Sequence, residues 1–497
     1  MSQLARGLCG VLLCVALFGC GGGSSSSSNE VLPAAQSVTI GTITGFGSVI
    51  VKGIRFDDRN AVVTVNDQIT TTTQLRVGMV VAVEGSVNAC PNAATALCEG
   101  IATRIRFNNN LEGPITQINR LTNTVQVMGR DVFIDDGTVV EGTGAGDLSG
   151  LNIGDVITVS GFNEQNRVRA TWLERLGTFV TDATPVIAQG VVANVNQLAG
   201  TCTVDGIPVN YQRVTAGNLP TGGLSNGQSV IVRGTAAGNG LVTANQIQLR
   251  ERISYPDAGL VQVEGYVSNF VSVSNFTVGA QVVDASNAVF LNGSATDLKN
   301  GVKVEVEGAL AASVLTARRV TFRGDTMAQV VAPLQSKETS TSSVVVLGQR
   351  ISTTPLTEFI DRTTGPGRPV RSLSYADLAV SDRIDIRAYK DASGKLVATR
   401  IERTAPDPLL IAKAAVDTKT PVTSLTILGI DVTTGPNTRY RDALQTLISA
   451  LDFYSLVQVP PALPSIVRAQ GIASPSSVTT IDATRSSSTH GEVALTP

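Results

Sequence analysis

An eleven-residue motif recurs along the chain and constrains the fold more than any other feature. It reads LRVGMVVAVEG from Leu75, LNIGDVITVSG from Leu151, LSNGQSVIVRG from Leu224 and LKNGVKVEVEG from Leu298, with weaker copies from Leu378 and Leu451. The leading leucines are 73 to 80 residues apart. A period of this kind is typical of tandem structural units. We therefore expect six units.

The second half of each motif predicts a β-strand with one face in a core. The sixth and eighth residues after the leucine are β-branched and apolar in all six copies: Val81 and Val83, Ile157 and Val159, Val230 and Val232, Val304 and Val306, Ile384 and Ile386, Val457 and Val459. Alternation with period two on a β-branched run indicates a half-buried strand.

Glycines mark both ends of this strand in the first four copies. The glycine three residues after the leucine, such as Gly78, predicts a turn with positive φ. The motif then closes on a second glycine, such as Gly85. The last two copies replace the first glycine by Ser381 and Tyr454, and the second by Ala388 and Pro461. We interpret them as divergent copies.

Each unit contains about five predicted strands. A hairpin-like segment such as GTITGFGSVIVKGIRFD from Gly41 precedes the motif, and a strand such as ATRIRF from Ala102 follows it. Five short strands are too few for a sandwich but enough to curl into a small barrel that hides its edges. The leucine spacing over Arg441–Leu451 predicts a helix, and SATDLKNG from Ser294 a single helical turn.

The first twenty residues predict export. Arg6 precedes an apolar stretch, Leu8–Phe18, which is too short to cross a bilayer as a helix, because about 20 apolar residues are needed. The ending LFGC resembles the lipobox of bacterial lipoproteins, and this resemblance implies lipid attachment at Cys20. The glycine and serine run from Gly21 predicts a flexible tether. A secreted protein that is cleaved elsewhere remains the alternative.

These signals divide the chain into a leader, a tether and successive barrels. We expect a signal peptide at 1–19, a lipidated tether at 20–37, barrels at 38–110, 111–186, 187–254 and 261–326, divergent barrels at 327–406 and 407–488, and a tail at 489–497.

The sequence resembles exported bacterial lipoproteins built from tandem copies of a small β-barrel domain of unknown function. GTITGFGSVIVKGIRFD, LRVGMVVAVEG and ATRIRF carry the resemblance, which covers most of the mature chain and is best over the first unit. It implies an all-β tandem array of about six five-stranded barrels, similar to oligonucleotide/oligosaccharide-binding barrels. Because Gly21 rather than Asp follows the cysteine, it also implies the outer membrane. It supplies no catalytic residue.

Three further cysteines follow the leader. Because an exported compartment is oxidising, Cys90 and Cys98 are predicted to form a disulfide. Cys202 is interpreted as a small buried residue on a strand, with a reactive thiol as the alternative.

Catalytic and metal chemistry find little support in the residue types present. His490 is the single histidine, so a triad or zinc site built on histidine is excluded. The carboxylate pairs Asp57 with Asp58 and Asp135 with Asp136 follow strands, where we interpret them as solvated turn residues. The DASGK segment from Asp391 predicts a hairpin turn. We expect no catalytic residue, no metal site and no cofactor.

Charge and composition narrow the possible partners. With 38 basic against 40 acidic residues and 4% aromatics, the chain has neither the field nor the stacking surfaces of a nucleic-acid-binding protein. We expect a non-enzymatic cell-envelope lipoprotein that binds or scaffolds, with a membrane contact through its lipid and an envelope polysaccharide or protein as partner. A structural spacer without a specific ligand is the alternative. Nucleic-acid or oligosaccharide binding by analogy with the barrel is the weakest hypothesis.

Overall fold

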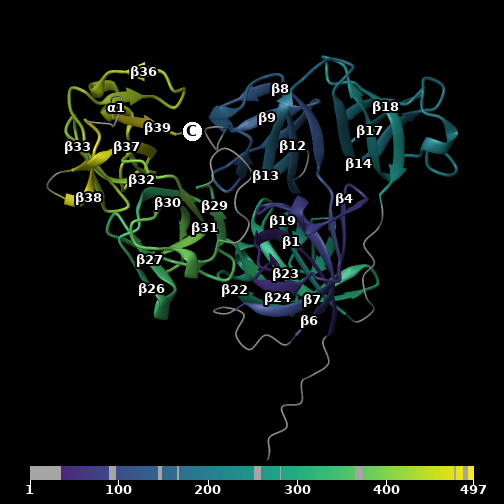
Figure 1. The fold of residues 1–497 in the computed structure, drawn as a ribbon, viewed down its shortest axis with the longest axis horizontal. Helices are drawn as coiled ribbons and strands as arrows, with labels where there is room; N and C mark the ends of the chain where they lie inside the picture. The colour runs from purple at the N-terminus through teal and green to yellow at the C-terminus, as the bar shows by residue number, and fades with distance from the viewer. Residues whose placement is uncertain are drawn as a thin grey trace, which may run out of the picture. The chain divides into compact units, whose positions relative to one another are not determined.

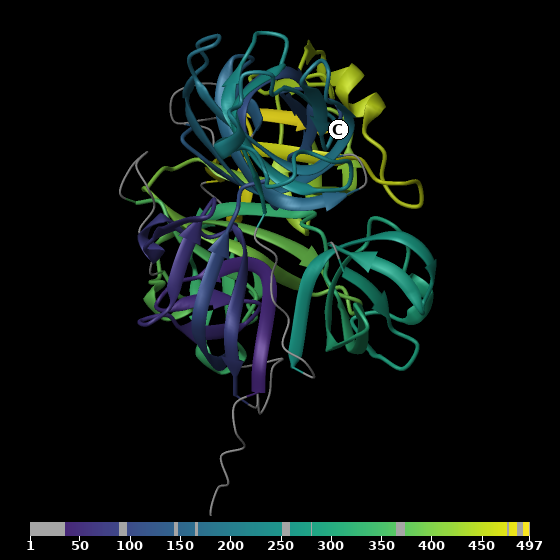
Figure 2. The ribbon, with the colours of Figure 1, turned by 90° about the vertical axis from the view of Figure 1, so that its right-hand side faces the viewer.

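Strands make up nearly all of the regular structure. The computed structural model describes residues 35–88, 97–143, 148–164, 167–250, 259–279, 281–363, 373–474, 477–484 and 491–496. Within these ranges there are 39 strands, six short 3-10 helices and one α-helix, α1 (Ala450–Leu456). Figures 1 and 2 show the strands as strongly curved sheets. The predicted all-β class is confirmed.

The described strands join into three sheets within one compact unit, Ala34–Pro497. The first sheet contains β1 (Ala35–Gly45), β2 (Val49–Val51), β3 (Ile54–Asp57), β4 (Val62–Val65), β5 (Gln68–Thr70), β6 (Val80–Val87), β7 (Cys98–Phe107), β19 (Leu260–Ser272), β20 (Asn275–Val278), β21 (Gln281–Asp284), β22 (Val289–Leu291), β23 (Lys303–Ala311) and β24 (Val314–Phe322). The second contains β8 (Leu111–Asn119), β9 (Thr124–Val127), β10 (Arg130–Phe133), β11 (Val139–Glu141), β12 (Asp155–Glu164), β13 (Arg167–Thr178), β14 (Pro185–Asn196), β15 (Thr201–Val204), β16 (Ile207–Asn210), β17 (Ser229–Ala236) and β18 (Val242–Leu249).

The third sheet holds the C-terminal part of the chain. It contains β25 (Ala328–Pro333), β26 (Ser336–Glu338), β27 (Ser343–Val346), β28 (Gln349–Ser352), β29 (Glu358–Asp361), β30 (Arg383–Lys390), β31 (Leu396–Thr404), β32 (Leu410–Thr420), β33 (Ser424–Ile427), β34 (Ile430–Thr433), β35 (Arg439–Arg441), β36 (Leu447–Ile448), β37 (Ile466–Ser474), β38 (Ser477–Asp482) and β39 (Glu492–Leu495).

Three small five-stranded barrels show how a sheet closes on itself. The pairing order β8-β9-β10-β13-β12 returns to β8, and β14-β15-β16-β18-β17 returns to β14. In the same way, β19-β20-β21-β24-β23 returns to β19. The pairings of β1-β2-β3-β7-β6 and of β32-β33-β34-β38-β37 follow this order as well. In each order the third and fourth strands are parallel, whereas the other neighbours are antiparallel.

The expected array of about six separate barrels needs correction. The first strands of two barrels pair edge to edge, as in β1 with β19, β8 with β14 and β25 with β32, so the strands form three shared sheets. The buried apolar residues of the described chain form four clusters, two of which extend over two sets of strands. Period-two alternation shows which face of a strand is buried but carries no information about its edge, so the sequence could not reveal this sharing.

The first glycine of the motif forms the predicted turn before the strand, whereas the second lies inside the strand and not at its end. Gly78 and its three counterparts have φ values of 83° to 92°, and Ser381 takes the same turn conformation with φ of 75°. Gly85 and its counterparts lie at β-bulges, where a Cβ would come within 1.9 to 2.1 Å of a carbonyl oxygen on the next strand. Only a residue without a side chain fits such a close approach of two backbones.

The last copy of the motif does not form the predicted strand. The residues after Val457 are a loop, and the strand role passes to β37, where Gly471 makes the close backbone approach that we had matched to Pro461. Pro460 and Pro461 lack the N–H groups that a central strand donates to its neighbours, which explains the displacement.

The predicted helix over Arg441–Leu451 is also wrong in position. Arg441 ends β35 and Leu447 begins β36, whereas the helix begins after Ser449, whose hydroxyl accepts a hydrogen bond from the Asp452 N–H at 3.1 Å. This cap sets the start of the helix. By contrast, the single turn predicted from Ser294 is confirmed as a 3-10 helix, Ala295–Asp297.

Candidate functional site

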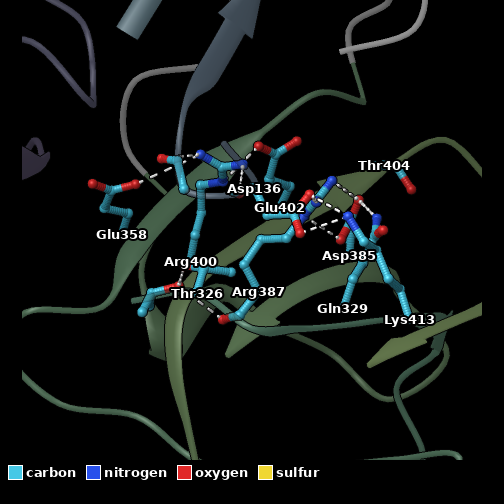
Figure 3. A network of polar contacts seen from close by, with 12 residues as sticks. Asp136, Thr326, Gln329, Glu358, Asp385, Arg387, Arg400, Glu402, Thr404 and Lys413 are labelled. Atoms are coloured by element: carbon cyan, nitrogen blue, oxygen red, sulfur yellow. Dashed lines mark hydrogen bonds and ion pairs between the residues drawn. The ribbon is translucent and has the colours of Figure 1, made fainter. Parts of the chain in front are cut away.

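The loop between β10 and β11 carries a carboxylate onto the third sheet. Asp135 shapes the loop, because its Oδ1 accepts a hydrogen bond from the Gly137 N–H at 2.9 Å and its own N–H donates to Thr138 Oγ1 at 3.1 Å. Such turns are typical of aspartate. They direct the next side chain, Asp136, toward β30, β31 and β32 (Figure 3).

Asp136 forms the centre of a network of charged side chains. Its carboxylate lies 2.7 Å from Lys413 Nζ and 3.4 Å from Arg387 Nη1. Arg400 donates to the backbone carbonyls of Asp136 and Gly137 at 3.4 and 3.2 Å. Burial acts to raise the pKa of Asp136, but Lys413 and Arg387 outweigh it, so the pKa lies below its ordinary value. The carboxylate is therefore ionised and ion-paired at neutral pH.

A second layer of carboxylates orients these cations (Figure 3). Asp385 lies 3.2 Å from Arg387 Nε and accepts a hydrogen bond from Gln329 at 2.8 Å. Glu402 lies 2.9 Å from Arg400 Nε. Burial acts to raise the pKa of Glu402, but Arg362 and Arg400 outweigh it and lower that pKa to about 2. The network thus neutralises most of its own charge.

The pKa of Glu358 is shifted in the opposite direction, upward. It opens β29, its side chain is 16% exposed, and its carboxylate is 3.9 Å from Arg400 Nη1. Burial raises the pKa of Glu358 to about 7, because Arg400 at this distance and Lys303 offset only part of the lost hydration. With this pKa, Glu358 can gain or lose a proton near neutral pH.

Glu358 lines a small polar cavity between the first and third sheets and the β10–β11 loop. The cavity measures about 90 Å³ and is also lined by Glu264 and Lys303, whose charged atoms are 2.8 Å apart. The Thr42 N–H donates to Glu264 at 2.9 Å, and the Thr42 hydroxyl has no hydrogen-bond partner among the described residues.

A larger groove lies on the other side of the same loop. It measures about 720 Å³, a size typical of ligand sites, and Asp136, Arg387 and Lys413 form part of its lining. The β8–β9 turn, the segment between β24 and β25, and the β35–β36 turn also line it.

The site residues predicted from the sequence fall in different places. Cys20, Cys90 and His490 lie outside the described residues, so lipid attachment and the disulfide between Cys90 and Cys98 stay predictions. Cys98 opens β7 and is buried. Cys202 is a buried free thiol on β15, as predicted, and burial raises its pKa to about 11. An unreactive, protonated thiol is therefore expected.

The carboxylate pairs that we interpreted as solvated turn residues differ in their exposure and partners. Asp57 lies 2.6 Å from Arg59 in an exposed ion pair, in agreement with that interpretation. Asp136 contradicts it, because its side chain is 29% exposed and pairs with cations of the third sheet. Asp391 forms the predicted hairpin turn and accepts from the Ser393 and Lys395 N–H groups at 2.8 and 2.9 Å. Within the described ranges, no cluster of acidic, cysteine or histidine side chains has an arrangement that could hold a metal ion.

Sequence reasoning missed the charged residues of the network. Arg387 and Arg400 alternate with apolar residues on β30 and β31, which is the pattern of a solvent-facing strand surface. The β10–β11 loop lies on both arginines, through the Asp136 carboxylate and the Asp136 and Gly137 carbonyls. A high density of arginine in DRIDIR and ATRIER was the available signal.

Comparison with known families identifies the repeat. A family model described as a domain of unknown function, DUF5666, matches residues 112–174, 189–248, 264–321 and 333–402. Together these segments cover just over half of the chain. The chain belongs to this family. A search of curated proteins found no match.

The four DUF5666 matches follow the strands closely. The first three lie within β8–β13, β14–β18 and β19–β24, which form the three five-stranded barrels described above. The fourth includes Leu378, whose motif we interpreted as divergent. The first unit, where we expected the best resemblance, lies outside these four segments. The tandem β-barrel repeat of unknown function is thus shown. The family match does not test the lipoprotein assignment, which stays a prediction.

Proposed function

We propose that this DUF5666 protein is a non-enzymatic lipoprotein of the cell envelope that binds and scaffolds. Its barrels present a surface to an envelope polysaccharide or to a protein partner. The observation that carries the proposal is the groove of about 720 Å³, which is built by segments from three parts of the chain. A chain that served only as a spacer has no need of such a surface.

The envelope location rests on the leader. The apolar stretch Leu8–Phe18 and the LFGC ending support export and lipid attachment at Cys20, and Gly21 supports the outer membrane. Among the described helices, none is long and apolar enough to cross a membrane. The lipid is therefore proposed as the membrane contact.

The contacts of Asp135 and Asp136 support binding over catalysis by this carboxylate pair. Hydrolysis by a carboxylate pair needs one acid and one ionised partner placed about 5 to 10 Å apart across a substrate. Asp135 holds its own turn and Asp136 is bonded to Lys413 and Arg387, so neither is available to a substrate bond.

Retention of envelope fractions tests the proposal. The full chain is immobilised and exposed to purified peptidoglycan, outer-membrane polysaccharide and solubilised envelope proteins. Saturable retention of one fraction by the folded chain, and not by the heat-unfolded chain, is expected. If no fraction is retained, the spacer without a specific ligand is the better description.

A further inference from the structure

Exposed aliphatic side chains converge on the groove from three segments. Leu121 in the β8–β9 turn is 49% exposed, Met327 before β25 is 61% exposed and Leu444 in the β35–β36 turn is 64% exposed. A single exposed aliphatic residue is ordinary on a protein surface. Three of them lining one groove from distant parts of the chain form an apolar surface that suits aliphatic side chains of a ligand.

One cation of the groove lining is not balanced by a carboxylate. Five cationic side chains line the groove, of which Arg387, Arg400 and Lys413 pair with carboxylates of the network described above. Arg120 donates to the backbone carbonyls of Leu148 and Leu151 at 3.0 and 3.2 Å, and no carboxylate of the described chain pairs with it. These bonds fix the position of the guanidinium and leave its charge uncompensated. A ligand with carboxylates therefore complements the groove.

The described lining of this groove offers no aromatic side chain on which a flat ring could stack. Among its described lining residues there is no Phe, Tyr, Trp or His. Stacking on aromatic side chains is the usual means of holding nucleobases, and the faces of sugar rings use the same kind of surface. The combination of aliphatic and cationic side chains favours a polypeptide over a glycan or a nucleic acid.

We propose that the groove binds an acidic peptide segment of a protein partner, in which aliphatic side chains stand beside aspartate or glutamate. The aliphatic side chains contact Leu121, Met327 and Leu444, and the carboxylates face Arg120. This inference rests on the proposed function, because it specifies which kind of partner the binding protein takes.

Fluorescence anisotropy with defined peptides tests the inference on the full chain. The probe is a labelled twelve-residue peptide that repeats Leu-Glu-Leu-Asp, and its counterpart repeats Leu-Lys-Leu-Lys. We expect saturable binding of the acidic peptide alone, weakened as salt is raised to about 0.5 M because charge attraction is screened. Leu444→Asp should weaken binding about tenfold or more, since it removes an aliphatic contact and adds a like charge.

The matched control is Leu198→Asp, because Leu198 is 99% exposed and does not line the groove. This variant should bind the acidic peptide as the unchanged chain does. Equal binding by Leu444→Asp and Leu198→Asp overturns the assignment, as does binding of polygalacturonate, an acidic glycan, in place of the peptide. Either result leaves the proposed function standing if an envelope fraction is still retained, whereas loss of all retention refutes the proposed function itself.

Discussion

At the scale of single residues, charged side chains in this protein differ in state because of small differences in their surroundings. Glu402 and Glu358 both approach Arg400, at 2.9 and 3.9 Å. Glu402 also bonds Arg362, and its pKa is lowered to about 2, whereas burial raises that of Glu358 to about 7. One additional guanidinium and 1 Å of distance therefore decide whether a carboxyl is ionised at neutral pH.

Glu358→Gln should show this difference as a change in pH dependence. The carboxyl has an ordinary pKa of 4.5 and a folded value of about 7, so the folded chain binds the proton more tightly. Its contribution to stability is fully present below pH 4.5 and is lost as the pH rises through 7. Across this range, we expect the free energy of unfolding of the unchanged chain to fall by on the order of 1–3 kcal/mol relative to that of the variant. Urea unfolding at several pH values measures it.

The control for that series is Glu338→Gln. Glu338 is exposed, and hydrogen bonds from Arg350 and Thr341 lower its pKa, so its contribution is lost only below its ordinary value. Between pH 4.5 and 7, the free energy of unfolding of the control variant should change with pH as it does for the unchanged chain. If that of Glu358→Gln also changes in this way, the raised pKa of Glu358 is refuted.

At the scale of strands, the bulge glycine determines how closely two neighbours approach. Gly234 on β17 shows the geometry, because the Thr243 carbonyl oxygen on β18 lies 2.1 Å from the place a Cβ would take. The pair of strands shifts register between Arg233 and Gly234. The extra residue bends the strand, which helps a five-stranded sheet to close.

Gly234→Ala should destabilise the chain while Gly217→Ala leaves it nearly unchanged. The first substitution forces β17 and β18 apart, at a cost of about 1–3 kcal/mol or more. Gly217 lies on the 3-10 helix Ala216–Asn218, where a Cβ meets nothing within 4 Å, so its substitution should stay within about 0.5 kcal/mol. Thermal unfolding compares the two. Equal stability of both variants would contradict the steric role of the bulge glycine.

At the scale of the whole molecule, the barrels are not structurally independent of one another. Their first strands share sheets, and the β10–β11 loop binds the third sheet through Asp136. Deleting a set of strands therefore exposes a sheet edge as well as removing a core. Point variants on the surface are better tools than deletions for locating a binding site in this chain.

The membrane contact is a property of the chain as a whole and can be tested separately from its fold. Cys20→Ser removes the proposed lipid site, so the protein should move from the membrane to the soluble fraction of fractionated cells. Thermal unfolding should not change, because Cys20 precedes the first described strand, which begins at Ala35. Continued sedimentation with membranes would refute attachment through a lipid on Cys20.

The sequence determined the content of the repeat. Leu75 and its counterparts marked the register, the alternation of Val81 and Val83 identified the strand, and Gly78 located the turn. These features are local, because side-chain direction and backbone φ depend on residues close in the chain. For the same reason the hairpin turn at Asp391 and the burial of Cys202 followed from their neighbours in the sequence.

Only the tertiary structure decided which strands share an edge and which charges are covered. Arg387 and Arg400 have the pattern of exposed strand residues, and Asp136 has that of a turn residue. Both arginines nevertheless contact Asp136, from which they are 251 and 264 residues away in the sequence. The pairing of β1 with β19 joins residues 223 apart in the sequence and uses backbone groups that every residue carries. Edges and contacts between barrels depend on how complete barrels pack, and a periodic pattern encodes only the interior of each one.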